Sequence, residues 1–167
     1  WSPEENGGDC QRIRQNLDAW ATSRSPSVIH INCGLHDLKK DFETGTAAVP
    51  LEDYEENVLQ ILSRLKRETE SVIIWALTTP VNEAWHHARK GFDRLEVDVL
   101  SYNATARKIC EDLQIPVNDL YSIINQGGRD ALLKPDGVHF EEPGCELLAR
   151  AVADVLQKHL PHTQHAQ

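Results

Sequence analysis

The chain has 167 residues, of which 40% are hydrophobic and 26% are charged, and its net charge is −9. This length and composition are ordinary for one globular domain with a substantial core. The acidic balance lacks the basic field that a nucleic-acid partner requires, and no apolar run approaches the roughly 20 residues that cross a bilayer. We therefore expect no nucleic-acid partner and no membrane span.

Helix-like and strand-like patterns alternate along the chain. Asp9 is placed to cap a helix in which Ile13, Leu17 and Trp20 share one face. The expected elements that follow are a strand at Val28–Ile31, a helix with Leu51, Tyr54, Val58, Leu62 and Leu65 on one face, a strand at 72–77, a helix over 93–113, a strand at 115–120, and a last helix with Leu148, Val152 and Val155 inward that Pro161 ends.

This alternation predicts an α/β fold with a parallel sheet. The loops at 36–50, 80–92 and 122–142 follow strand ends, at the rim where open α/β sheets bind ligands. Because the first segment is a helix, the strand that should precede it is absent from this chain. Either an N-terminal segment or a neighbouring copy is expected to complete the sheet.

We expect residues 1–160 to form a single, N-terminally incomplete domain and residues 161–167 to form a flexible tail. The chain begins at Trp1 and contains no Met, which suggests a processed piece or an excerpt. A signal peptide would lie upstream of Trp1, so the sequence does not predict the cellular compartment.

Two short segments carry the candidate chemistry. Asp136 and His139 place a carboxylate and an imidazole three positions apart, just before the last helix. Such a pair can orient a histidine and stabilise its charged form. The segment 32–37, Asn-Cys-Gly-Leu-His-Asp, follows the first expected strand. A hydrolase that used these residues would also need a nucleophile, and the sequence shows no convincing one.

The order of three segments resembles the SGNH (GDSL-type) hydrolase family. They are Gly8-Asp9, Gly34-Leu35-His36-Asp37 and Asp136-Gly137-Val138-His139. The resemblance implies a flavodoxin-like, three-layer α/β/α fold, with the first strand apparently absent. It also implies that the family's Gly-Asp-Ser block would lie upstream of Trp1. Gly8-Asp9-Cys10 imitates that block, but no hydrophobic strand precedes it, so we assign Gly8 to the family's oxyanion-glycine block.

The family mechanism implied for this chain is acyl transfer from a small ester substrate. A serine would attack the ester carbonyl, His139 would act as general base, and Asp136 would orient it. Gly8 and His36 would contribute to the oxyanion hole, with His36 in place of the family's asparagine. Neither a metal nor a cofactor is needed. The acyl and alcohol parts of the substrate and the oligomeric state are not predicted.

Two other functions stay open. The chain could be a non-catalytic binding domain, or pseudo-enzyme, that kept the histidine loop without a nucleophile. It could instead be a Cys10-dependent acyl hydrolase. We expect Asp37 to be structural, the adjacent His86 and His87 to lie on a solvated loop, and the four scattered cysteines to be free core thiols rather than zinc ligands.

Overall fold

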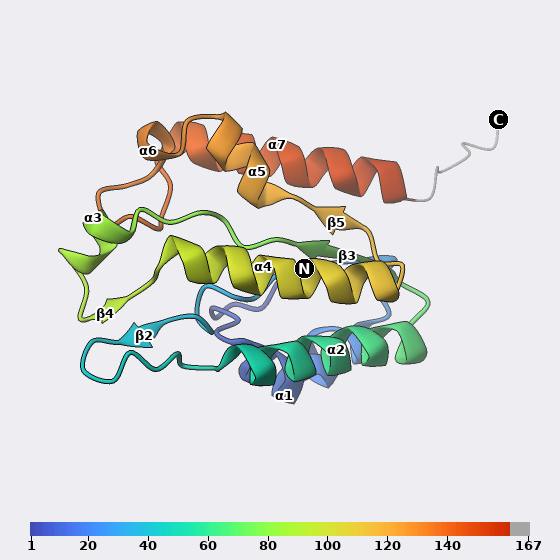
Figure 1. Cartoon of the computed structure of the whole chain (residues 1–167). Coiled ribbons are helices and arrows are strands. Elements are labelled where there is room, and N and C mark those ends of the chain that lie inside the picture. Colours follow the sequence, from blue (N-terminus) through green and yellow to red (C-terminus); the bar gives the residue numbers. More distant parts are fainter. Residues whose placement is uncertain (161–167) are drawn as a thin grey trace.

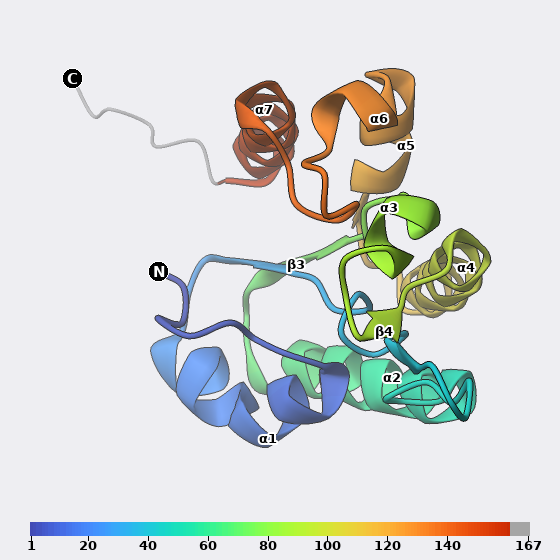
Figure 2. The ribbon, with the colours of Figure 1, turned by 90° about the vertical axis from the view of Figure 1, so that its left-hand side faces the viewer.

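The computed structural model describes residues 1–160 and shows a parallel sheet between helical layers (Figures 1 and 2). The sheet has the strand order β1-β3-β5 and consists of β1 (Val28–Ile31), β3 (Val72–Ala76) and β5 (Val117–Asn118). The helices are α1 (Cys10–Trp20), α2 (Leu51–Glu68), α3 (Glu83–His87), α4 (Glu96–Asp112), α5 (Leu120–Gln126), α6 (Arg129–Leu132) and α7 (Glu142–His159), with a 3-10 turn at Thr22–Arg24. The predicted α/β fold is confirmed.

Helices cover both faces of this sheet. In Figure 2, α1 and α2 lie on one side and α7 lies on the other. The buried face of α2 carries Tyr54, Val58, Ile61, Leu62 and Leu65, as its apolar spacing predicts. Asp9 caps α1 by accepting the N–H of Arg12 at 2.9 Å, which confirms the predicted helix start.

The register of the parallel strands places their ends at one rim. Val28 pairs with Val72 and Ile31 pairs with Trp75, while Ala76 pairs with Asn118. The loops that follow β1 and β3 therefore leave the sheet side by side. This rim is the one predicted to carry ligands.

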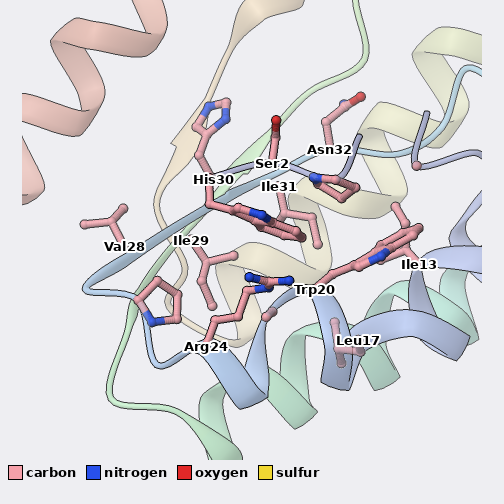
Figure 3. Close-up of a pocket in the computed structure, with 15 residues that line it drawn as sticks. Ser2, Ile13, Leu17, Trp20, Arg24, Val28, Ile29, His30, Ile31 and Asn32 are labelled. Carbon is pink, nitrogen blue, oxygen red and sulfur yellow. The ribbon is translucent and has the colours of Figure 1, made fainter. Parts of the chain in front are cut away.

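The free edge of β1 has an apolar groove beside it. Within residues 1–160, β1 pairs only with β3, so its other edge has no strand partner. A groove of about 520 Å³ runs along this edge, between β1 and the α1 side chains Ile13, Leu17 and Trp20 (Figure 3). On the opposite face, Gly144 is the one buried residue of α7. The predicted gap in the sheet is therefore present in the structure.

Several predicted boundaries were wrong in detail. The expected helix over 93–113 begins at Glu96, because residues Phe92–Asp93 form a two-residue strand, β4, antiparallel to β2 (Lys40–Asp41). The expected strand at 115–120 is shorter because Asp119 caps α5 by accepting the N–H of Ser122. Two-residue strands contain only one repeat of the alternating strand pattern, so periodicity could not reveal them.

Two further expectations concern the ends of the domain. The tail at 161–167, including Pro161, lies outside the described residues, and the single-domain boundary at 160 stays a prediction.

Within 1–160, no helix is both long enough and apolar enough to cross a membrane. Cys10, Cys33 and Cys110 are free and buried as expected, whereas Cys145 is exposed.

The core of α2 provides a test of this fold. Leu62 is fully buried, and Leu59 on the same helix is 44% exposed. Replacing Leu62 by Ala leaves a cavity beneath the sheet, so we expect the free energy of unfolding to fall by about 2–5 kcal/mol. Urea denaturation measures this loss. The matched Leu59→Ala variant should change stability by less than about 0.5 kcal/mol, and equal losses in both variants would contradict the predicted helix face.

Candidate active site

Asp136 and His139 form a preorganised carboxylate–imidazole pair. Their loop closes between α6 and α7, where the N–H of Lys134 donates to the carbonyl of His139 at 2.7 Å. Asp136 Oδ1 accepts the backbone N–H groups of Val138 and His139 at 3.2 and 3.0 Å. Asp136 Oδ2 lies 2.5 Å from His139 Nδ1. One carboxylate therefore fixes both the turn and the orientation of the ring.

The electrostatics favour a charged Asp136. Burial acts to raise its pKa, but the hydrogen bonds from the His139 ring and from the two backbone N–H groups outweigh burial and hold the pKa well below its usual value. Lys90 Nζ adds a positive charge 3.7 Å from Asp136 Oδ2. An ionised Asp136 places the imidazole proton on Nδ1, so Nε2 of the neutral ring is free to accept a proton.

Gly137 holds this loop against α3. Its φ is +76°, which favours glycine, and a Cβ at this position would lie 2.4 Å from the carbonyl oxygen of Asn82. The N–H of Asn82 also donates to the carbonyl of Gly137 at 2.9 Å. The start of α3 therefore packs against the Asp136–His139 turn and holds it in place.

The loop after β1 is fixed by buried groups. Gly34 has a φ of +143°, and a Cβ there would lie 2.3 Å from Thr78 Oγ1, which follows β3. Asp37 is fully buried, and its Oδ1 accepts the backbone N–H of Cys10 at 2.8 Å. Asp37 thus ties the start of α1 to this loop, which confirms its expected structural role.

His36 lies at the exposed tip of the same loop. Its ring makes no hydrogen bond with residues 1–160, so its N–H is available to a ligand. Partial desolvation and the Arg94 guanidinium lower the pKa of His36. The ring is therefore neutral at pH 7, the form in which it has one donor and one acceptor nitrogen. Its oxyanion role stays a prediction.

Gly8 differs from the expectation of a free oxyanion donor. Its φ is +72°, and its N–H donates to Asn6 Oδ1 at 2.8 Å. An oxyanion would have to replace the Asn6 side chain to use this N–H. Its role in the oxyanion hole therefore stays a prediction that requires this exchange.

Burial argues against Cys10 as a nucleophile. The Cys10 side chain is fully buried, and desolvation together with the nearby Asp37 carboxylate raises the pKa of its thiol far above the ordinary value. A reactive cysteine requires an accessible thiolate. The Cys10-dependent alternative is therefore disfavoured.

The structure also gathers residues that the sequence analysis missed. The expectation that His86 lies on a solvated loop was wrong: His86 is fully buried, while His87 is exposed and lies 2.7 Å from Asp93. Arg94 is 7% exposed and contacts both His86 and the loop of His36. The five-residue helix α3 has no periodicity that would have revealed this burial.

Among the described residues, no hydroxyl or thiol is hydrogen-bonded to His139, and no group of side chains is arranged to hold a metal ion. Within 1–160, the only side-chain hydrogen bond of the His139 ring is the one to Asp136, and His139 Nε2 has no partner. The same part of the chain contains no cluster of three or more His, Cys, Asp or Glu side chains that could hold a metal ion.

The depressed pKa of Asp136 predicts a pH-dependent stability. The unfolded chain binds this proton more tightly than the folded chain, so ionised Asp136 stabilises the fold above pH ~4 and the contribution fades as the pH falls below that value. Asp136→Asn should therefore lower the Tm at pH 7, and its difference from the wild type should shrink towards pH 3. Thermal unfolding followed by circular dichroism measures both values.

The matched control is Asp154→Asn, on the exposed side of α7. It should leave the Tm within about 1 °C of the wild type at both pH values, because Asp154 makes no hydrogen bond with the described side chains. A deficit in Asp136→Asn that stays constant between pH 7 and pH 3 would contradict the electrostatic account.

Known proteins resemble this chain in sequence and in fold. No family model matches the chain. A curated GDSL esterase/lipase, WDL1 of Oryza sativa subsp. japonica, is 25% identical over an alignment that covers 91% of this chain and 63% of that protein. The chain thus spans less than two thirds of the length of this relative.

Solved structures share the fold. The lipase/acylhydrolase from Enterococcus faecalis superposes with a TM-score of 0.79 at 19% identity, over 95% of this chain and 75% of that one. Axe2, an acetylxylan esterase from Geobacillus stearothermophilus, gives a TM-score of 0.71 at 19% identity, over 89% and 68% of the two chains. The chain is thus similar in sequence to a GDSL esterase/lipase, as its motifs predict, and it shares the fold of these solved structures.

Proposed function

We propose that this chain supplies the general base and oxyanion donors of a serine ester hydrolase that acts on small acyl or carbohydrate esters. The observation that carries the proposal is the Asp136–His139 contact of 2.5 Å, which leaves His139 Nε2 free and exposed. The relatives named esterase, lipase or acylhydrolase support the same reaction class. A carbohydrate ester as substrate rests on the likeness to the acetylxylan esterase alone.

The proposed reaction runs in two halves. A serine Oγ bonds to the ester carbonyl carbon as its proton moves to His139 Nε2, and the carbonyl electron pair moves onto oxygen. Asp136 stabilises the imidazolium, which then protonates the departing alcohol. Water attacks the acyl-enzyme with the same base and releases the acid. The serine N–H, the Gly8 N–H and the His36 ring would hold the oxyanion.

We place the serine on a strand that pairs with the free edge of β1. This edge and the apolar groove beside it offer backbone hydrogen-bonding groups and side-chain burial to one more strand (Figure 3). A parallel strand there would end at the rim that carries the His36 loop. The strand would come from a segment outside residues 1–167. A strand from a neighbouring copy is the competing source.

The non-catalytic alternative makes a different prediction. A binding domain or pseudo-enzyme would keep the same contacts among Asp136, His139 and His36 without hydrolysing esters. The complete protein, rather than residues 1–167 alone, therefore has to be tested.

The test is hydrolysis of p-nitrophenyl acetate by the complete protein. His139→Ala should reduce kcat by several orders of magnitude because the general base is lost. His36→Ala should cost on the order of a hundredfold, since other oxyanion donors remain. Cys10→Ser should retain most of the activity.

The matched control is His159→Ala. His159 ends α7 and lies beside Val72, at the opposite end of the sheet from the candidate site. This variant should keep wild-type activity. Hydrolysis that survives His139→Ala, or that Cys10→Ser abolishes, would refute the proposed mechanism.

A further inference from the structure

Arg94 is a buried cation with neutral hydrogen-bond partners. It lies between β4 and α4 and is 7% exposed. Its Nε donates to the carbonyl oxygen of Leu35 at 2.6 Å, and its Nη1 lies 3.2 Å from His86 Nε2. The Phe92 ring lies 5.0 Å from its guanidinium carbon.

Burying the charged guanidinium of Arg94 costs free energy when no carboxylate pairs with it directly. Within residues 1–160, no carboxylate forms a salt bridge with Arg94. Desolvation lowers the pKa of Arg94, and the more distant Asp136 carboxylate opposes that shift. A neutral side chain of similar length would avoid the cost of burying a charge. The contacts of Arg94 therefore call for a functional explanation.

Those contacts join the two loops that carry the candidate catalytic histidines. Leu35 precedes His36 in the loop after β1. His86 belongs to α3, and a Cβ on Gly137 would lie 2.9 Å from its backbone nitrogen, so this part of α3 packs directly under the Asp136–His139 turn. Among the described residues, Arg94 hydrogen-bonds both to the loop of His36, through the Leu35 carbonyl, and to α3, through His86.

The tautomer of His86 follows from the same contact. A guanidinium has donors only, so His86 Nε2 must accept and the ring proton must lie on Nδ1. His86 Nδ1 is buried and has no partner among residues 1–160. Desolvation, Arg94 and Lys90 lower the pKa of His86, against smaller opposing effects of Asp93 and Asp136. A neutral His86 is therefore a stable acceptor for Arg94.

We propose that Arg94 is a positioning residue that joins the His36 loop to the α3 support of the Asp136–His139 turn. Its rigid planar fork sets the spacing between the oxyanion donor and the general base. Its charge also acts on His36: desolvation, Arg94 and Lys39 lower the pKa of that ring, and Asp37 and Asp9 oppose the shift. The role of Arg94 in catalysis rests on the proposed function. The hydrogen bonds of Arg94 to Leu35 and His86 do not depend on that function.

Two substitutions in the complete protein separate the effect of the planar guanidinium, which makes two hydrogen bonds, from the effect of its positive charge. Arg94→Gln removes the charge, so the NMR titration midpoint of His36 should move to higher pH. Arg94→Lys keeps the charge and should leave that midpoint near the wild-type value. Both variants lose the planar fork, so both should reduce kcat for p-nitrophenyl acetate by about 10- to 100-fold with little change in KM.

The control is Arg107→Gln. Arg107 lies near the C-terminal end of α4 and forms a 2.8 Å ion pair with Asp119, the cap of α5, so losing this pair should change neither readout. The inference is overturned if folded Arg94→Gln keeps the wild-type His36 midpoint and kcat. If Arg94→Gln does not fold, a folded Arg94→Lys with wild-type kcat overturns it. If the wild type hydrolyses no ester, the proposed function fails, while the His36 midpoints of the Gln and Lys variants still test whether the Arg94 charge acts on the His36 loop.

Discussion

Parallel pairing of β1 with β3 determines where the loop of His36 lies relative to the residues that follow β3. Because the two strands run in the same direction in register, the loops after Ile31 and Ala76 leave the sheet at one rim. Gly34 then approaches Thr78 too closely for any other side chain, and Asp37 binds the start of α1. A change of strand direction would move the His36 loop to the opposite end of the sheet.

The rest of the site is assembled by polar contacts between loops. Asp136 uses one oxygen on the backbone of its own turn and the other on His139. Gly137 lets that turn sit on α3, and Arg94 connects α3 to Leu35. Because the partners lie on different elements, the geometry of His139 and His36 depends on tertiary packing, not on either loop alone.

The sequence predicted the repeating part of this structure well and the irregular part poorly. The cap at Asp9 and the apolar face of α2 follow from local chemistry that several adjacent residues share. The two-residue strands β2 and β4 and the short helix α3 contain too few residues for a periodic pattern. Arg94 and His86 could not be found for a related reason: their burial results from contacts with Leu35 and Gly137, which are about 50 residues away in sequence or more.

The central claim is that His139 activates a serine held next to β1. The most direct measurement is labelling of the complete protein with a fluorophosphonate, followed by peptide mass spectrometry. An activated serine displaces fluoride and forms a bond to phosphorus, while its proton passes to His139. The account predicts one adduct, on a serine outside residues 1–167, that is lost in His139→Ala. An adduct on Cys10, or labelling that persists in His139→Ala, would contradict it.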